Sequence, residues 1–469
     1  MQTLLILGAG MSASSLIRYV LGRAEKYDWE IRIVDQQKEL IERKTNGHPR
    51  AVALTFDALN PAERLPEIKR SDLVISMLPP RFHPDVAREC IAHGKHLITP
   101  SYISSELAEL DDEEKKAGVL IMNEIGVDPG IDHMSAMAII HKLKNEGAEI
   151  TAFKSFCGGL IAPESDDNPW NYKFTWNPRN VVLAGQGGAS CFIDHNEYKY
   201  IPYHRLFSRL IHVNVDGFGD FEGYANRDSL AYRKTYGIES VPTIFRGTLR
   251  RPDFSTAWNV FIELGMTDDS YKMERSEELT PRNFINAFLP YVPNMPVEEK
   301  FKLFLGKSRL QLFERFDWLG LFDGEKVFGL PDASPAQLLQ QLLETKWVLN
   351  PTDKDMLVMV HEFEYIKNGK THQILSSMVN IGEDQTYTAM SNTVGLPVGI
   401  AAKLILLGKI DLRGVTLPIQ PEVYTPILEE LSELGIQFKQ KTAYEISTCD
   451  WSSDVCSSDL EPSRRDSMY

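Results

Sequence analysis

The stretch TLLILGAGMSASSL, residues 3–16, decides the fold that the sequence predicts. An apolar run over residues 3–7 predicts a buried strand, and the residues after the glycines show the spacing of a helix. Between strand and helix lies G-x-G-x-x-A. Gly8 makes the turn, Gly10 lets the backbone approach a pyrophosphate, and Ala13 allows the helix to pack closely. Strand, motif and helix together predict a dinucleotide-binding loop at a helix N-terminus.

A second strand is predicted over residues 30–34, and it ends at Asp35. A carboxylate at this place binds the ribose hydroxyls of the adenosine half and repels a 2′-phosphate. We therefore expect NAD rather than NADP, with a plain strand-end turn residue as the alternative for Asp35. The expected cofactor-binding residues are Gly8, Gly10, Met11, Ser12, Ala13, Asp35, Asp57, Leu78 and Pro79.

Strands and helices continue to alternate along the chain. Apolar runs predict strands over residues 51–57, 72–78, 95–99 and 119–123. This alternation predicts an α/β fold with a parallel, doubly wound sheet of the Rossmann type. His83 starts the helix after the fourth strand. Because such a histidine is more often a surface or capping residue, we assign it no chemistry.

The sixth strand runs into an acidic loop, NEIGVDPGIDH, residues 123–133, which precedes another helix. Ligands of parallel α/β proteins gather outside the carboxyl ends of the strands, so this loop is a candidate site. For Asp132 we expect an N-cap of the next helix, because that position favours aspartate. Asp128 has no such local role, and it is the residue that we single out.

Polar segments in the middle of the chain provide further candidates. Residues 166–179 mix aromatic, amide and charged side chains, which suits either a small-molecule pocket or an irregular surface loop. Three arginines follow at Arg246, Arg250 and Arg251. They could each clamp a carboxylate with two hydrogen bonds, or form salt bridges on a solvated face.

The pattern of the whole chain predicts its domains. We expect a Rossmann domain, an α/β substrate domain with a mixed sheet that includes a hairpin at Asn368-Gly369, and an α-helical insertion. The corresponding ranges are 1–127 completed by 383–447, then 128–267 with 351–382, and 268–350.

The last residues do not follow this pattern. Residues 450–460, DWSSDVCSSDL, match the in-frame translation of a common sequencing adapter. A natural Ser- and Asp-rich disordered tail would have a similar composition but no reason to reproduce that translation. We therefore predict that residues 448–469 are an assembly artefact and exclude them from the fold.

Composition restricts the classes of function. A chain of 469 residues with 43% hydrophobic and 25% charged residues is typical of a globular protein of two or three domains. A net charge of −15 argues against non-specific binding of nucleic acid or anionic membranes. We find no window approaching the roughly 20 apolar residues of a membrane span, and no basic region of a signal peptide. Five scattered cysteines predict a reducing cytoplasm and no metal site.

With these segments in view, residues 1–446 resemble the saccharopine dehydrogenase family of the glutamate-forming type, also called saccharopine reductases. The resemblance implies hydride transfer between NAD or NADP and the secondary amine that links glutamate to aminoadipate semialdehyde in lysine metabolism. The amine becomes an imine, which water hydrolyses. The family also implies a homodimer. The segments that carry the resemblance are residues 123–133, 156–160, 162–164, 172–179, 226–229 and 246–249.

The resemblance also implies a site. We expect Asp128 to be the polar group nearest to the reacting nitrogen, with Tyr102 and Cys157 close by and bound water as the alternative proton carrier. Family members that use NADP often carry basic or hydroxyl residues after the second strand, where this chain has Asp35. The residues expected to hold the substrate are Ser101, Tyr102, Asp128, Arg227, Arg246, Gly247 and Thr248.

Two alternatives remain open. The first is a carboxyspermidine-type or lysine-6-type dehydrogenase on the same scaffold. Those substrates carry fewer carboxylates, so Arg227 and Arg246 favour saccharopine. The second alternative is a regulator that binds NAD without catalysis. A regulator would leave the dense polar loop over residues 123–133 unexplained.

Overall fold

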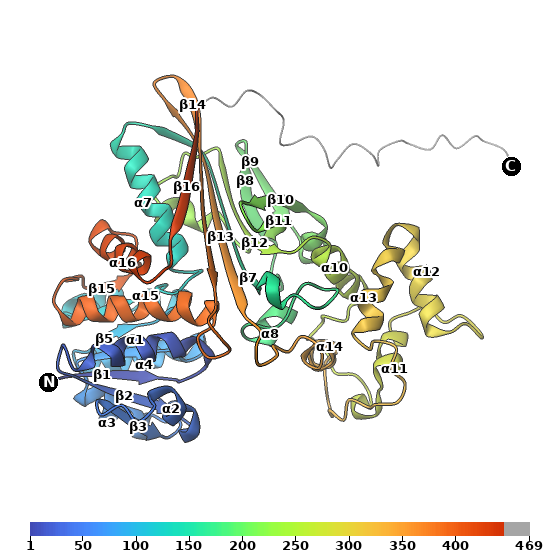
Figure 1. Cartoon of the computed structure of the whole chain (residues 1–469), viewed down its shortest axis with the longest axis horizontal. Coiled ribbons are helices and arrows are strands. Elements are labelled where there is room, and N and C mark those ends of the chain that lie inside the picture. The colour runs from blue at the N-terminus through green and yellow to red at the C-terminus, as the bar shows by residue number, and fades with distance from the viewer. Residues whose placement is uncertain (445–469) are drawn as a thin grey trace.

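The computed structural model describes residues 1–444 of the chain. The first of its two sheets is parallel, with seven strands in the order β15-β6-β5-β4-β1-β2-β3 (Figure 1). Its inner strands are apolar along their length, as expected where helices cover both faces of a sheet. The predicted doubly wound sheet is confirmed. Its strands are β1 (Gln2–Leu7), β2 (Trp29–Asp35), β3 (Ala51–Thr55), β4 (Leu73–Ser76), β5 (His96–Ile98), β6 (Leu120–Met122) and β15 (Gly414–Thr416).

Several of these strands end earlier than the apolar runs predict. β3 stops at Thr55 and β4 at Ser76, because the residues beyond them turn into loops at the carboxyl edge of the sheet. The helices between the strands are α1 (Ser14–Ala24), α2 (Lys38–Thr45), α3 (Pro61–Arg70), α4 (His83–Ala92), α5 (Ser105–Ala108) and α6 (Asp111–Ala117).

Helix α15 (Ala389–Leu406) packs along α1 (Figure 1). Gly395 permits this close approach, since a Cβ there would lie 2.7 Å from the backbone nitrogen of Leu16. The helix starts at Ala389, where the side chain of Thr388 caps it. Contrary to the expectation from hydropathy, α15 is long and apolar enough for a membrane span by composition, with a mean hydropathy of 1.4. Of that window, 78% is buried inside the protein, as in a core helix.

The second sheet is mixed and contains nine strands, with the long strands β7 and β13 at its centre (Figure 1). β12 and β7 are parallel neighbours, and β13 and β14 form the predicted hairpin around Asn368-Gly369. α7 (Ile131–Asn145) leads from the first sheet into β7. The strands are β7 (Glu149–Ile161), β8 (Ser190–Asp194), β9 (Glu197–Ile201), β10 (Leu210–Val215), β11 (Gly219–Ala225), β12 (Thr243–Arg250), β13 (Asp355–Lys367), β14 (Lys370–Ile381) and β16 (Phe438–Tyr444).

The second half of the molecule has a core of its own, rich in aromatic side chains. Trp170, Trp258 and Trp347 lie in it together with side chains of the helices of the predicted insertion. Those helices are α11 (Pro281–Asn286), α12 (Val297–Arg309), α13 (Phe313–Trp318) and α14 (Pro335–Glu344), and Figure 1 shows them on the side of the molecule away from the first sheet. The other helices of this half include α8 (Pro178–Val182), α9 (Ala231–Thr235) and α10 (Phe254–Leu264).

The C-terminal part of the chain is shared between both sheets. β15 joins the first sheet as predicted for residues 383–447, and α16 (Pro421–Glu433) packs against α7. β16 instead pairs with β14 at the edge of the second sheet, which differs from the expectation that this whole segment completes the first domain. The segment predicted to be an adapter artefact, residues 448–469, lies outside the described residues.

Candidate active site

The acidic loop after β6 is closed by hydrogen bonds within itself. The amide of Gly126 donates to Pro129 O at 3.0 Å, and the amide of Ile131 donates to Gly126 O at 2.9 Å. Gly130 is required in this turn: its φ is +145°, and a Cβ there would lie 2.1 Å from Gly126 O. The loop is therefore a rigid support for the side chains that it carries.

The loop brings two carboxylates onto one arginine from the second sheet. Arg246 Nη2 on β12 donates to Asp128 Oδ1 and to Asp132 Oδ2, each at 2.6 Å. The side chains of Arg246 and Asp132 are buried, with 5% and 1% exposed, and that of Asp128 is partly buried, with 16% exposed. We call these residues, with Tyr102, the acid cluster. The cluster joins the two sheets where the expected nicotinamide and substrate halves meet.

The expected N-cap role of Asp132 is wrong. The residue before α7 is Gly130, and Asp132 lies inside the first turn. Its Oδ1 accepts a hydrogen bond from the Gly130 amide at 2.6 Å, and its Oδ2 faces Arg246. Local sequence preference could not reveal this role, because the partner lies 114 residues away along the chain.

The two carboxylates of the cluster differ in proton affinity. Burial, with Asp132 adding to it, raises the pKa of Asp128 against the opposing charge of Arg246. Burial also acts to raise the pKa of Asp132, but His133, Arg246 and the Gly130 amide outweigh it and lower that pKa. Asp128 is therefore the carboxyl group better suited to take up and release a proton near neutral pH.

Next to the cluster lies a second buried chain of polar groups. His133 Nε2 lies 2.7 Å from Glu124 Oε2, and its Nδ1 lies 2.6 Å from the hydroxyl of Tyr236. Tyr232 stacks on His133 and also lies under the guanidinium of Arg246, 4.0 Å from ring centroid to Cζ. The sequence placed Glu124 and His133 in a candidate loop but assigned them no role. Nothing in the local sequence pointed to the tyrosines.

Tyr102 and Ser101 reach the cluster from the segment after β5. The Glu124 amide donates to Ser101 O at 3.1 Å, so this segment runs beside the acidic loop. The hydroxyl of Tyr102 donates to Asp128 Oδ1 at 3.1 Å. Cys157 on β7 is buried opposite Thr248, and burial and Asp128 raise the pKa of its thiol. The structure thus brings together the three residues that we expected near the reacting nitrogen.

His83 is not the surface or capping residue that we expected. Its side chain is fully buried at the start of α4. Nδ1 lies 3.0 Å from the hydroxyl of Ser76, and Nε2 lies 2.9 Å from the hydroxyls of both Thr99 and Ser101. Burial lowers the pKa of His83 to about 4, so the ring is neutral at physiological pH. The ring holds the ends of β4 and β5 together and fixes the hydroxyl of Ser101.

The remaining expected substrate residues lie on or beside β12. Gly247 and Thr248 pair with Phe156 and Cys157 of β7. Arg227 follows β11, and the amide of the residue before it donates to Arg246 O at 2.8 Å. The side chain of Arg227 is exposed, whereas that of Arg246 is buried.

The glycine motif lies at the same carboxyl edge of the first sheet. Gly8 has a φ of +98°, and no heavy atom lies within 4 Å of a Cβ built on Gly10, which leaves room for a pyrophosphate. Asp35 Oδ2 accepts from the Ala9 amide at 2.8 Å and its Oδ1 accepts from the Gln37 amide at 3.0 Å. The loop residues thus fit a bound dinucleotide.

A buried lysine, which sequence reasoning missed, supports the glycine motif. Lys44 Nζ on α2 donates to the carbonyl oxygens of Ala9 and Gly10, each at 2.6 Å. Burial lowers its pKa to about 8. Nothing distinguishes this lysine from other helix lysines in the sequence.

The other expected cofactor residues surround this edge with different exposures. Met11 is largely exposed and begins the short helix that also contains Ser12. Asp57 is exposed, and its Oδ1 accepts from the Leu59 amide at 2.9 Å, so it also closes a turn. Leu78 is half-buried and Pro79 exposed after β4.

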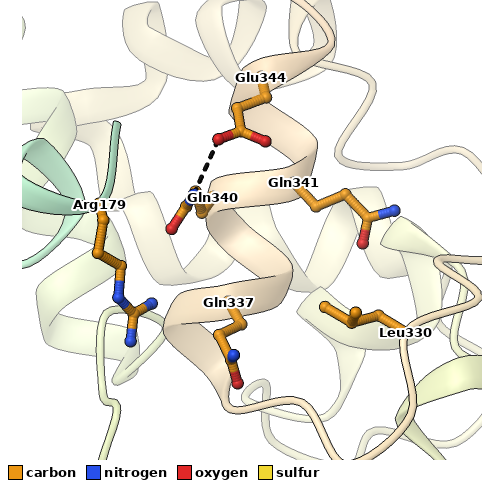
Figure 2. A pocket seen from close by; sticks show the side chains of 6 residues that line it. All are labelled: Arg179, Leu330, Gln337, Gln340, Gln341 and Glu344. Carbon is orange, nitrogen blue, oxygen red and sulfur yellow. Dashed lines mark hydrogen bonds between the residues drawn. The ribbon is translucent and has the colours of Figure 1, made fainter. Parts of the chain in front are cut away.

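A hollow of about 330 Å³ lies elsewhere, along α14 (Figure 2). Its lining includes Arg179, Gln337 and Glu344, and it shares no residue with the acid cluster. Arg179 belongs to one of the segments that carry the family resemblance, and it pairs with Asp269. This hollow therefore lacks the candidate catalytic groups of the acid cluster.

The parallel sheet, its glycine loop and the acid cluster beside it define an oxidoreductase of the dinucleotide-binding class. Comparison with known families makes this specific. Residues 4–122 match the saccharopine dehydrogenase NADP binding domain, and residues 126–436 match the saccharopine dehydrogenase C-terminal domain. The chain belongs to the saccharopine dehydrogenase family, which confirms the resemblance predicted from its motifs.

Individual relatives extend over nearly the whole chain. It is similar to the saccharopine dehydrogenase [NADP(+), L-glutamate-forming] of Schizosaccharomyces pombe, at 32% identity over 94% of this chain and 99% of that protein. It is 34% identical to the mitochondrial alpha-aminoadipic semialdehyde synthase of Mus musculus, over 95% of this chain and 48% of that protein.

Solved structures agree with this assignment. The apo saccharopine dehydrogenase (L-Glu forming) of Saccharomyces cerevisiae has a TM-score of 0.85 at 30% identity, covering 94% of this chain and all of that one. A homospermidine synthase of Legionella pneumophila, solved with NAD, has a TM-score of 0.55 at 12% identity over 99% of this chain and 95% of that one. The second match shows a shared fold alone.

Proposed function

We propose that this protein interconverts saccharopine with L-glutamate and 2-aminoadipate 6-semialdehyde, using a nicotinamide dinucleotide. The observation that carries the proposal is the acid cluster, in which Asp128 lies at the junction of the two sheets with a raised pKa. The full-length similarity to enzymes named for this reaction supports it.

In this reaction, Asp128 would transfer protons, and its neighbours would hold it in place. A secondary amine must be neutral before hydride can leave its carbon, so a base has to take the ammonium proton. Asp128 is suited to this task because its raised pKa brings it closer to neutral pH, and Tyr102 and Arg246 fix the position of its Oδ1. A bound nicotinamide ring supplies the hydride acceptor. Asp128 would then exchange protons with the water that hydrolyses the imine.

The choice of cofactor has two lines of support that point in opposite directions. The family match and the names of the fungal relatives support NADP. The carboxylate of Asp35 beside the glycine loop was the reason to expect NAD, and the comparisons do not support that preference. The apparent affinities for NAD and NADP decide between them, and Asp35→Ser should shift the ratio towards NADP if the carboxylate repels the 2′-phosphate.

The decisive experiment is to offer saccharopine with NADP and with NAD and to follow the absorbance of reduced nicotinamide. We expect turnover with saccharopine and none with carboxyspermidine or lysine. Turnover of either rival amine in place of saccharopine would assign the chain to a different activity on the same scaffold. Cofactor binding without turnover of any of the three would indicate a regulator.

Two further expectations accompany this function. We propose a homodimer, which light scattering of the purified protein would test. We also propose a cytoplasmic location, although the relative from mouse is named as mitochondrial. Fluorescence microscopy of the tagged chain in its own cell would distinguish the two compartments.

A further inference from the structure

Arg250 is the last residue of β12, four residues after Arg246. Alternate residues of a strand point to the same face, so Arg246, Thr248 and Arg250 lie along one face of β12. Thr248 is paired with Cys157 in the neighbouring strand. Arg246 and Arg250 are therefore separated by about 13 Å along the strand, and the position of Thr248, which pairs with Cys157, lies between them.

The surroundings of Arg250 are apolar and aromatic. Its guanidinium carbon lies 5.1 Å from the ring centroid of Tyr172, 5.7 Å from that of Tyr224 and 5.4 Å from that of Phe254. Only 4% of the residue is exposed. Cation–π contacts of this kind hold a guanidinium in place, but they do not neutralise its charge.

Arg250 lacks the counter-ion that such burial requires. Nη1 donates to its neighbour's carbonyl, Leu249 O, at 2.8 Å, and Nε is buried without an acceptor. Within the part of the chain that the structure describes, it forms no ion pair. Glu222 is its register partner on β11, but the carboxylate of Glu222 accepts the amides of Asp253 and Ser255 at the start of α10.

An unpaired buried cation is strongly unfavourable, and a negatively charged group of a bound ligand would remove that cost. Arg246 shows the opposite solution, because two carboxylates of the chain already occupy its Nη2. The planar fork of an arginine matches a carboxylate with two parallel hydrogen bonds. An extended amine that carries carboxylates on both arms would reach from Asp128 towards the end of β12.

We infer that Arg250 binds one carboxylate of the substrate, whereas Arg246 serves as the internal counter-ion of Asp128 and Asp132. This inference rests on the proposed function and specifies it: Arg250 distinguishes a substrate with a carboxylate at that end from an amine without one. It also changes the sequence-based expectation, in which Arg246 itself held the substrate.

The test is the variant Arg250→Met, which keeps the length of the side chain and suits the three rings but removes the charge. We expect KM for saccharopine to rise about 30-fold or more, with kcat and the KM of the cofactor within twofold of wild type. Arg250→Lys keeps the charge but loses the planar guanidinium. Its KM for saccharopine should lie between those of the wild type and Arg250→Met. Arg251→Met is the matched control, because Arg251 donates to Phe218 O and stacks on Phe221.

Substrate analogues identify the carboxylate concerned. Removing one carboxylate from the six-carbon arm or from the glutamate arm should weaken binding to the wild type in either case. With Arg250→Met, one of the two analogues should bind as well as saccharopine, since the variant has already lost the partner of the missing group. An equal loss for both analogues in the variant and in the wild type would overturn the assignment.

Thermal unfolding without substrate excludes a purely structural role. Arg250→Met should unfold at the wild-type temperature or above it, because the variant no longer buries an unpaired charge. A lower unfolding temperature together with a wild-type KM would overturn the inference and leave the proposed function intact. If the wild type does not oxidise saccharopine, the proposed function fails, and this assignment fails with it.

Discussion

Arg246 and Arg250 lie on the same strand, and each exposes only 4% of its surface. The first donates to two carboxylates at 2.6 Å, while the second is enclosed by aromatic rings and pairs with no carboxylate among the described residues. Their difference comes from what packs over each end of β12. At Arg246 it is the acidic loop of the first sheet, and at Arg250 it is the aromatic core of the second half.

This difference separates two uses of a buried cation. Burial opposes the charge of Arg246, but the carboxylates beside it hold its pKa well above the usual range. Its charge is therefore permanent, and two carboxylates of the same chain neutralise it. Arg246 acts to lower the pKa of both acids, but burial outweighs it at Asp128, whose pKa is raised, while His133 and the Gly130 amide help to lower that of Asp132. A pair of acids with separated proton affinities is typical of a site that moves protons. Arg250 donates to one backbone carbonyl, and its Nε is without an acceptor.

The largest expected effect is on catalysis at the Arg246 end. Asp128→Asn removes the carboxyl that exchanges the proton, so kcat should fall about 10²- to 10⁴-fold. The KM of the cofactor should stay within about twofold, because the glycine motif is separate from Asp128. Steady-state kinetics with both substrates varied checks this. A kcat close to that of the wild type would remove Asp128 from the proton path.

The next effect is on stability, and it contrasts the two arginines directly. Arg246→Met leaves two buried carboxylates facing each other, so the free energy of unfolding should fall by about 3–5 kcal/mol. Adding Asp132→Asn to that variant should restore part of the loss. Arg250→Met should show no such loss in the same urea titration. Equal destabilisation by both substitutions would mean that the two charges are held in the same way.

Two buried histidines contrast with the two buried arginines. The histidines are neutral at physiological pH, whereas the arginines carry a charge. Burial lowers the pKa of His83 and of His361 to about 4 in each case. An unfolded histidine titrates near 6.5, so their stabilisation is complete above that pH and is lost as pH falls from about 6.5 to about 4. The loss should reach at most about 3 kcal/mol for each.

Denaturant unfolding at pH 7 and pH 5 measures this loss. His83→Gln and His361→Gln should each flatten the decline in stability between the two values. His195→Gln is the control, since 88% of the His195 side chain is exposed. A decline that is the same in all three variants would show that other groups cause it.

The smallest effect concerns how His83 positions Ser101. His83→Gln can keep the contact that Nε2 makes, while His83→Asn can keep only the contact of Nδ1 with Ser76. We expect KM for saccharopine to rise about fivefold in the Asn variant and to stay nearer to wild type in the Gln variant, as for the loss of one hydrogen bond. Equal KM values in both variants would limit His83 to a structural role.

Local sequence patterns predicted most of the first sheet. Strands β1 to β6 were predicted as apolar runs followed by a turn, and the glycine motif had its required place after β1, while β15 was not predicted as a strand. The strand ends were less accurate, since β3 and β4 stop before the apolar runs do. The segment that contains β16 was expected to complete the first domain, but β16 pairs with β14 of the second sheet, and a single polar strand carries no sign of which neighbour will pair with it.

The candidate site was predicted in part. Asp128, Tyr102 and Cys157 meet as expected, because they follow or lie on strands of known order. Asp132 and His83 were misassigned for a shared reason: both sit at the start of a helix, where capping is the common role of such residues. Their actual partners are remote in sequence, and no local preference contains that information.

By itself, the sequence determined the class of the fold, the dinucleotide loop and the loop around Asp128, since these depend on the period of apolar residues and on glycines at fixed spacing. Only the tertiary structure decided which buried charges pair with an opposite charge of the same chain. Arg246 and Arg250 have similar neighbours in sequence, and they differ because α7 places Asp132 against the first and no carboxylate of the described chain against the second. Electrostatic energy depends on distance in space and on exclusion of water, and both arise only when the two sheets pack together.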